Sequence, residues 1–258
     1  IPCIYGILKA GAAYVPIDPK YPTTRINDII ENSALKVVLT RSTHAHDSSW
    51  VKDKSINLDE VWAQIESLTS EPLPEKAAPT DLAYVIYTSG STGLPKAVLV
   101  QHSSVVNYCH AKNSAQQINA SARVLLASAF VFDPNLGDIF STLAAGATLC
   151  VASHELVCSH LPDVVAVSQA THLLTTPAIW SLIDPQDDVI QRKIQTLRCV
   201  ALGGEAMSNH LIAAWGVCDN ASAKDPRTSK LKLYNTYGVT EVTVYNSLYL
   251  VQQHSSTR

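Results

Sequence analysis

The sequence predicts an α/β fold with a largely parallel sheet. Short apolar runs alternate with helix-like runs through most of the chain, a pattern typical of parallel strands joined by helical crossovers. The 258 residues are 47% hydrophobic and 16% charged, which is a globular composition in a chain long enough for a substantial buried core.

The N-terminal part of the chain is expected to hold two helices and several short strands. Residues 1–10 are helix-like with Gly11 as their C-terminal cap, and Thr23 or Thr24 is expected to cap a second helix. The expected strands are 12–17, 36–40 (buried), 83–88 and 98–100. Residues 41–80 are polar and interrupted by prolines, which predicts a surface connection.

Strands and helices alternate regularly after a helix that begins at Ser103. The expected strands are 124–128, 148–152, 172–175, 196–202 and 232–235. The expected helical runs between them are 136–143, 161–168, 179–183 and 210–215. Residues 219–231 are polar and charged and predict an exposed loop.

Composition argues against several classes of function. A net charge of −3 gives no general attraction to nucleic acid or to an anionic membrane. The six cysteines form no CxxC pair, so a zinc site or a disulfide framework is not expected. No apolar run reaches about 18 residues and no signal peptide is visible, so we expect a cytoplasmic protein with no membrane or nucleic-acid partner.

The sharpest local feature is a Ser/Gly-rich loop over residues 87–96, directly after an expected strand. Gly90 and Gly93 allow positive φ and leave room for phosphate oxygens, and Lys96 supplies positive charge. The hydroxyl donors are Thr88, Ser89, Ser91 and Thr92. The spacing GxxGxxK differs from the GxxxxGK[ST] loop of nucleotide hydrolases. The alternative is a plain surface turn between strands.

Three further features each allow two interpretations. Asp133 follows an apolar run, so its carboxylate either finds a cation or caps the next helix. The turn at residues 203–206 either borders a nucleotide or simply joins a strand to a helix. Glu241 is either a metal ligand or a solvated carboxylate in a loop.

Four blocks of the sequence occur in the order of a known superfamily. They are residues 8–19 with Tyr21, Pro22 and Arg25, then residues 88–96, then Phe132 with Asp133, and then residues 235–241. Together they resemble the adenylate-forming enzymes, which include acyl-CoA synthetases, luciferases and peptide-synthetase adenylation domains. The first block and Asp133 resemble the amino-acid-activating domains of nonribosomal peptide synthetases in particular. Two departures are Ala97 where the family has glycine and Val239 where it has proline, which frees φ and is expected to loosen that turn.

The resemblance implies a layered αβαβα fold, the large N-terminal core of such an enzyme. Residues 1–258 are then part of this core, truncated at both ends, with the small C-terminal lid domain and the carrier domain outside the sequence. The implied reaction is ATP-dependent: an amino acid carboxylate attacks the α-phosphate and gives an aminoacyl-adenylate and pyrophosphate. The product is loaded onto phosphopantetheine of a carrier domain, and neighbouring carrier and condensation domains are the implied partners.

The resemblance also assigns roles to residues that match its blocks. The catalytic residues are Lys96, Thr88 and Glu241, of which Glu241 ligates Mg²⁺. ATP is held by Thr88, Ser89, Gly90, Ser91, Thr92, Gly93, Lys96, Gly204, Glu205, Ala206, Asn235, Tyr237, Gly238 and Thr240. The substrate is held by Asp133, which binds its α-ammonium group, and by Pro134, Gly137, Thr175, Ala201, Gly203, Thr236, Val244 and Tyr245. None of these pocket residues besides Asp133 is charged, so we expect a neutral, fairly hydrophobic or aromatic amino acid.

Two other functions remain open at this point. One is the adenylation module of an aminoadipate-type carboxylate reductase or another acyl ligase, and the other is a nucleotide-binding fragment without turnover. All of these interpretations require the loop around Gly90 and the carboxylate of Glu241 to meet at one bound triphosphate.

Overall fold

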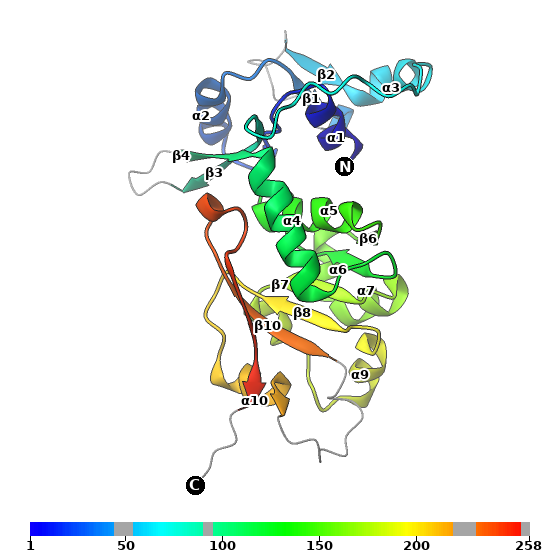
Figure 1. The fold of residues 1–258 in the computed structure, drawn as a ribbon, viewed down its shortest axis with the longest axis vertical. Coiled ribbons are helices and arrows are strands. Elements are labelled where there is room, and N and C mark those ends of the chain that lie inside the picture. Colours follow the sequence, from blue (N-terminus) through cyan, green and yellow to red (C-terminus); the bar gives the residue numbers. More distant parts are fainter. Residues whose placement is uncertain (44–53, 90–94, 219–230, 254–258) are drawn as a thin grey trace. The chain divides into compact units, whose positions relative to one another are not determined.

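The computed structural model describes residues 1–43, 54–89, 95–218 and 231–253 (Figure 1). The chain divides into two compact units, an N-terminal unit of residues 1–102 and a C-terminal unit of residues 103–258. In the described part of the chain, no helix has the length and apolar character needed to cross a membrane. The loop expected at 219–231 lies outside the described residues except for Leu231.

Helix α1 (Pro2–Lys9) ends at a glycine, as predicted. The Gly11 N–H donates to the carbonyl of Leu8 at 3.0 Å, and the Ala12 N–H donates to the carbonyl of Ile7 at 3.1 Å. These two bonds form a Schellman motif, which requires a left-handed residue at Gly11, whose φ is +79°.

The strand expected at residues 12–17 is wrong, because only one residue of this segment pairs with a neighbouring strand. The Tyr14 N–H donates to Ala83, and the Tyr14 carbonyl accepts from Val85. Pro16 lacks the N–H that a longer ladder needs. Helix α2 (Thr23–Ser33) follows, but its cap residue is Pro22 and no side chain caps it, so the predicted threonine cap is also wrong.

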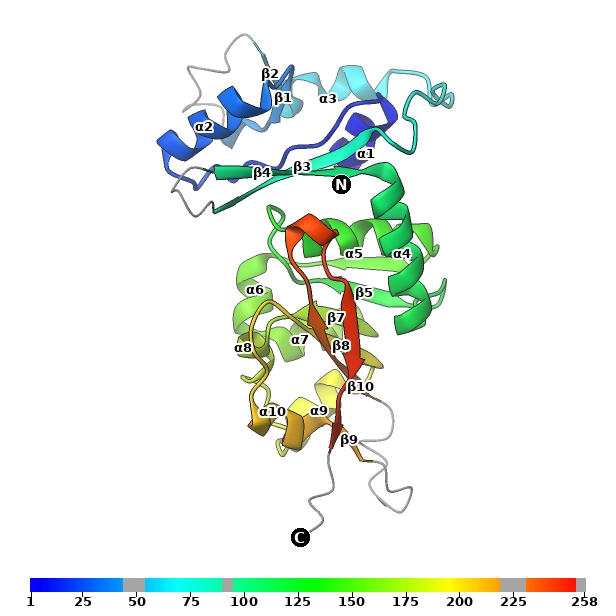
Figure 2. The ribbon, with the colours of Figure 1, turned by 60° about the vertical axis from the view of Figure 1, so that its left-hand side comes forward.

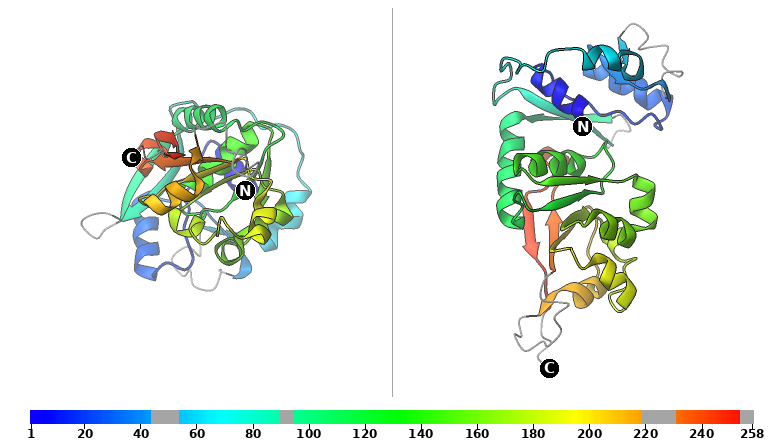
Figure 3. Two further views of the ribbon diagram at one scale, coloured as in Figure 1. Left: turned by 90° about the horizontal axis from the view of Figure 1, so that it is seen from below. Right: turned by 90° about the vertical axis from the view of Figure 1, so that its right-hand side faces the viewer.

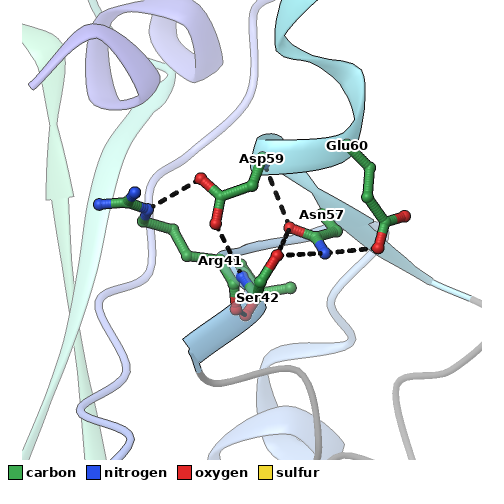
Figure 4. A network of polar contacts seen from close by, with 6 residues as sticks. Arg41, Ser42, Asn57, Asp59 and Glu60 are labelled. Carbon is green, nitrogen blue, oxygen red and sulfur yellow. Dashed lines mark hydrogen bonds and ion pairs between the residues drawn. The ribbon is translucent and has the colours of Figure 1, made fainter.

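The polar region 41–80 contains a strand, β2 (Ser55–Asn57), and a helix that the sequence analysis missed. Strand β2 pairs in parallel with β1 (Val38–Thr40), the strand expected at 36–40, which is half-buried rather than buried. Helix α3 (Leu58–Glu66) then begins at Asn57, whose side chain accepts from the Asp59 N–H. The Asp59 carboxylate also accepts from the Ser42 N–H at 3.0 Å and from Arg41 at 3.1 Å (Figure 4). Capping by Asn57, rather than apolar periodicity, is the signal for this helix.

Strands β3 (Leu82–Ser89) and β4 (Pro95–Gln101) form an antiparallel pair and confirm the strands expected at 83–88 and 98–100. In their register, Thr88 lies opposite Lys96 and Ser89 lies opposite Pro95. The Ser/Gly-rich loop therefore joins two antiparallel strands and is not followed directly by a helix.

The C-terminal unit consists of a sheet with helices on both faces (Figures 2 and 3). Its helices are α4 (His102–Gln116), α5 (Asp133–Ala144), α6 (His154–Ser159), α7 (Leu161–Ser168), α8 (Pro177–Trp180), α9 (Asp188–Ile194), α10 (Asn209–Trp215) and the 3₁₀ turn η2 (Thr240–Val242). Its strands are β5 (Arg123–Leu126), β6 (Thr148–Val151), β7 (His172–Thr175), β8 (Cys199–Leu202), β9 (Val217–Cys218), β10 (Lys232–Tyr237), β11 (Ser247–Leu250) and β12 (Gln252–Gln253).

The main sheet has six strands in the order β11-β10-β8-β7-β5-β6, all parallel except β11, and so confirms the predicted sheet. Successive residues of the strands point to opposite faces. Leu173 and Val200 join the cluster formed with α6 to α10, whereas Leu174 and Ala201 face the opposite side. On that side, α4 contacts the sheet through the Ala115 carbonyl, which accepts from the Tyr234 hydroxyl.

The strand order reverses direction at β5. The chain passes from β5 to β6 on one side, and then crosses to β7 on the other side of β5. In open parallel sheets, the crevice at the carboxyl ends of strands beside such a reversal is the usual ligand site. The segments that leave these two ends carry Asp133, after β5, and Thr175 with Thr176, at the end of β7.

Candidate functional site

Several predicted pocket residues meet at the carboxyl edge of the main sheet. Thr175 lies opposite Leu202, and Leu202 lies opposite Asn235. The Gly203 N–H donates to the Thr175 carbonyl at 3.1 Å, and the Thr236 hydroxyl donates to the Leu202 carbonyl at 3.0 Å. The ends of β7, β8 and β10 are thus tied together beside the reversal of strand order.

A side chain at position 203 would collide with Thr236, so the glycine at this edge is required by the packing. A Cβ atom at this position would lie 2.2 Å from Oγ1 of Thr236. Ala201, two residues earlier on the same strand, is completely buried. These two predicted pocket residues are therefore part of a tightly packed wall.

Asp133 is the first residue of α5, and its side chain does not cap the helix. The cap residue is Phe132, and the Asp133 carboxylate instead accepts from the Val244 N–H at 3.2 Å and from the Thr240 hydroxyl. The alternative assignment of Asp133 as a helix cap is therefore wrong. Among the described ion pairs, none involves this carboxylate.

The pKa of Asp133 is raised to about 6, mainly by burial and to a smaller extent by the negative charge of Glu241, against the hydrogen bonds from Val244 and Thr240, which lower it. A buried carboxylate without a cation is costly, so the group is suited to bind a cationic ligand.

The turn that approaches Asp133 has an unusual backbone. Thr243 and Val244 have φ values of 65° and 74°, in the left-handed region that β-branched residues rarely adopt. Such conformations cluster at functional sites. The turn also requires Gly238, because a Cβ atom there would lie 2.2 Å from Cα of Tyr245. Val239 has φ −131°, which the ring of a proline cannot adopt. The backbone at this position therefore differs from the one that a proline would impose, which is a larger change than the slight loosening expected from the sequence.

Helix α4 forms a wall of this site that the sequence analysis missed. A Cβ atom at Gly137 would lie 2.8 Å from Cε1 of Tyr108 and 3.1 Å from Cγ2 of Val244. The ring of Tyr245 meets that of Tyr108 edge-on, with 5.2 Å between centroids. The Tyr245 hydroxyl accepts from Nε2 of Gln116 at 2.9 Å. Pro134 is half-buried in the first turn of α5.

A buried ion pair joins the same two helices. Lys112 of α4 contacts Asp138 of α5, and their side chains are 1% and 0% exposed. Burial lowers the pKa of Lys112, but the neighbouring Asp138 offsets this and the pKa is raised, whereas burial raises the pKa of Asp138 against the effect of Lys112. The available sequence signal was Asp138 itself, a charged residue in the apolar run 136–143.

The residues assigned to the nucleotide are exposed along the same edge of the sheet. Tyr237, at the end of β10, is 70% exposed, and Asn235, Glu205 and Ala206 are also exposed. Gly204 has φ +83°, and beyond its chain neighbours no atom of the described residues lies within 4 Å of where a Cβ of this residue would be. These groups offer a flat aromatic face, an amide and an open turn.

The carboxylate that the sequence analysis assigns to a metal, that of Glu241, lies at this edge together with those of Asp133 and Glu205. Glu241 is exposed in the turn that holds Asp133, near Gly238 and Thr240. Among the described residues, no group of three or more His, Cys, Asp or Glu side chains is placed to hold a metal. This donor set fits Mg²⁺, which is often held by one or two carboxylates together with substrate phosphates and water.

The N-terminal unit holds the residues on either side of the Ser/Gly-rich loop, at the end of β3 and the start of β4. Lys96 is exposed on β4, and the Thr88 hydroxyl opposite it donates to its carbonyl at 3.5 Å. Gly90, Ser91, Thr92 and Gly93 lie outside the described residues. Arg25 of α2 donates to the Tyr87 carbonyl at 3.5 Å and lies 4.6 Å over the ring of Tyr21. The first block thus contacts Tyr87, the residue directly before the block at 88–96.

Comparison with known proteins identifies relatives along the whole chain. The family described as AMP-binding enzyme matches residues 1–257. One of the subunits of linear gramicidin synthase from Brevibacillus parabrevis is 36% identical over 250 residues, which are 96% of this chain and 3% of that protein. Nonribosomal peptide synthetase TES of Alternaria alternata is 34% identical over 241 residues, 93% of this chain and 4% of that protein.

A solved structure has the same fold over nearly all of the chain. The AMPPNP-bound form of the nonribosomal peptide synthetase FmoA3 (S1046A) aligns with a TM-score of 0.82 at 26% identity. The alignment covers 98% of this chain and 26% of that one. The chain therefore spans only a small part of the length of these relatives.

Proposed function

This chain belongs to the AMP-binding enzymes, in the group of nonribosomal peptide synthetase adenylation domains, and from that premise we propose that it activates an amino acid with ATP. A carboxylate oxygen of the amino acid attacks the α-phosphorus of ATP, and the bond from that phosphorus to the bridging oxygen of the β-phosphate breaks. The products are an aminoacyl-adenylate and pyrophosphate. The matched family and the AMPPNP-bound relative support the use of ATP, and the choice of an amino acid is the finer part of the proposal.

The observation that supports this choice is the buried carboxylate of Asp133. It lies at the reversal of strand order, and no described ion pair involves it. An α-ammonium group would provide the cation that this carboxylate needs, whereas a plain carboxylic acid would leave it uncompensated. Asp133 would therefore select amino acids and orient the substrate carboxylate toward the α-phosphate.

The residues expected to hold ATP keep their proposed roles within each unit taken by itself. In the N-terminal unit, the flanks of the Ser/Gly-rich loop, Thr88 with Ser89 and Lys96, would hold the phosphates. In the C-terminal unit, Tyr237 would lie against adenine and Asn235 would hydrogen-bond its exocyclic amine. Mg²⁺ bound to Glu241 would neutralise charge on the phosphates during the transfer.

The remaining steps would involve domains beyond these residues. The relatives are far longer than this chain, which supports action within a larger synthetase. We propose that residues 1–258 are part of the N-terminal core of the domain, and that a lid domain completes the site. The adenylate would be passed to phosphopantetheine on a carrier domain next to a condensation domain. A cytoplasmic location stays a prediction.

The test is amino-acid-dependent exchange of pyrophosphate into ATP by the full-length protein. Asp133→Asn keeps the shape of the side chain but removes its charge, and we expect exchange to fall about 100-fold, since losing one partner of a buried charge pair costs several kcal/mol. Asp163→Asn is the matched control, because Asp163 forms an exposed ion pair with Lys193 on α7 and α9. Equal exchange with amino acids and with plain carboxylic acids, or an unaffected Asp133→Asn variant, would refute the proposal.

A further inference from the structure

The turn that holds Asp133 keeps a backbone conformation that its own residues disfavour. Thr243 and Val244 have φ values of 65° and 74°, and β-branched residues keep a left-handed conformation only where the surrounding structure holds them. In this conformation the Val244 N–H donates to the Asp133 carboxylate at 3.2 Å. The contacts that fix the turn therefore fix the carboxylate as well.

Tyr245, the next residue, ties this turn to helix α4. Its hydroxyl oxygen accepts from Nε2 of Gln116 at 2.9 Å, and the Tyr108 hydroxyl is a second hydrogen-bond partner. Gln116 is 6% exposed, so its bond to Tyr245 is largely shielded from water. The backbone of Tyr245 packs against Gly238, where a Cβ atom would lie 2.2 Å from Cα of Tyr245. Both the side chain and the main chain of Tyr245 are thus anchored.

Gln116, the last residue of α4, is itself held by the main sheet. Its carbonyl accepts from Nε2 of His172 on β7 at 3.0 Å. The carbonyl of the preceding residue, Ala115, accepts from the Tyr234 hydroxyl on β10 at 3.4 Å. The end of α4 is therefore fixed to two strands, and the side chain of Gln116 reaches from this fixed point to Tyr245.

The hydrogen bond between Gln116 and Tyr245 thus bears on how Asp133 is held. While it is made, the ring of Tyr245 stays on α4 and the Val244 N–H stays directed at the carboxylate. Once it is lost, the turn can relax toward the negative φ that valine prefers, which turns the N–H away. The carboxylate then loses a hydrogen bond that orients it, and bonds to charged groups are the stronger kind.

We propose that Gln116 is a positioning residue for amino acid binding: through the Tyr245 hydroxyl it holds the turn at 240–245 so that the Val244 N–H fixes the Asp133 carboxylate. Gln116 acts through another residue and is not itself assigned to a ligand. This inference rests on the proposed function and deepens it, because it names a residue of α4 that determines how well the ammonium group is recognised.

The experiment measures pyrophosphate exchange by the full-length protein with its preferred amino acid and with the matching carboxylic acid that lacks the amino group. Gln116→Leu removes the hydrogen-bond donor and keeps a similar volume. We expect kcat/KM for the amino acid to fall about tenfold, which is the value of one hydrogen bond, mainly through a higher KM. The preference for the amino acid over the carboxylic acid should fall by the same factor, since only the amino acid uses Asp133.

Further variants trace the effect to Tyr245 and Asp133. Tyr245→Phe removes the acceptor and should lower the preference at least as much, and adding Gln116→Leu to it should have little further effect. In the Asp133→Asn background, Gln116→Leu should change kcat/KM less than about twofold, because the charge that it positions is gone. Gln191→Leu is the matched control, since Gln191 is half-buried on α9, on the other face of the sheet from α4.

The outcomes separate this inference from the proposed function. A Gln116→Leu variant that keeps the wild-type preference for the amino acid overturns the inference. A loss that persists in the Asp133→Asn background also overturns it, because Gln116 would then act on the shape of the pocket. If Gln116→Leu does not fold, Tyr245→Phe decides in the same way. A wild-type protein without amino-acid-dependent exchange refutes the proposed function, and the inference fails with it.

Discussion

Replacing Lys112 with methionine tests the buried ion pair between α4 and α5. Methionine has a similar length and no charge, so the packing of the stem is retained while the Asp138 carboxylate loses its cation. Oδ2 of Asp138 has no hydrogen-bond partner among the described residues, so Lys112 provides the main compensation for this buried charge. Removing one partner of such a pair costs about 3–5 kcal/mol, and we expect the C-terminal unit to lose that much stability at neutral pH.

The loss should depend on pH in a defined direction. In the Lys112→Met variant, burial raises the pKa of Asp138 in the folded state, and no cation opposes it. The folded state then binds a proton more tightly than the unfolded state, whose aspartate pKa is about 3.9. Stability is therefore lost as the pH rises from about 3.9 through the raised pKa of Asp138 in the folded state. The variant should be closer to wild type at pH 5 than at pH 7.

Urea unfolding of the full-length protein, followed by tryptophan fluorescence, measures this loss. Trp180 is fully buried and its ring centroid lies 5.0 Å from that of Trp215, so both report on the C-terminal unit. Lys193→Met removes an exposed ion pair in the same unit and should cost less than about 1 kcal/mol. Adding Asp138→Leu to Lys112→Met should recover most of the stability. A loss below about 1 kcal/mol in the single variant would refute the reasoning.

Three further predictions follow from the site. Because the pKa of Asp133 is raised to about 6 and an ammonium group binds its ionised form, amino acid affinity should weaken about tenfold per pH unit below 6. Calorimetric titration between pH 5 and 7.5 measures this, and Asp133→Asn should remove the dependence. Gly203→Ala forces a methyl group against Thr236 and should cost about 1–3 kcal/mol in urea unfolding, partly recovered by adding Thr236→Ala. Thr243→Asn suits the left-handed backbone better and should raise stability by up to about 1 kcal/mol in thermal melts.

The two central strands of the main sheet, β7 and β8, were predictable because they are buried on both faces. Residues 199–202 are almost completely buried and form an unbroken apolar run, and the equally buried residues 172–175 have Leu173 and Leu174 at their centre. The helix at 161–168 was also found, because its apolar face covers this sheet. Helix α9 (Asp188–Ile194) was missed, since only Ile194 is buried and its start depends on the Asp187 cap.

The sequence predicted the site residues that lie at the ends of parallel strands, but not those whose contacts depend on how two helices pack. Asp133, Gly203 and Thr236 each follow or end a parallel strand, and parallel strands bring their carboxyl ends to one edge, so their proximity follows from the pattern. The contact of Tyr108 with Gly137 depends on how α4 packs on α5, and neither residue has a local pattern that indicates it. The charged partner of Asp138 could not be identified for the same reason.

Asp133 and Glu241 belong to one electrostatic unit although they are assigned to different ligands. The negative charge of Glu241 raises the pKa of Asp133, and both carboxyl groups are held by the turn at 240–244. A cation at Glu241 offsets that charge and favours the ionised form of Asp133. Under the proposed function, the metal that accompanies ATP would therefore strengthen binding of the ammonium group near and below pH 6, where Asp133 is partly protonated. Because such coupling is reciprocal, the bound amino acid strengthens binding of the metal by the same factor.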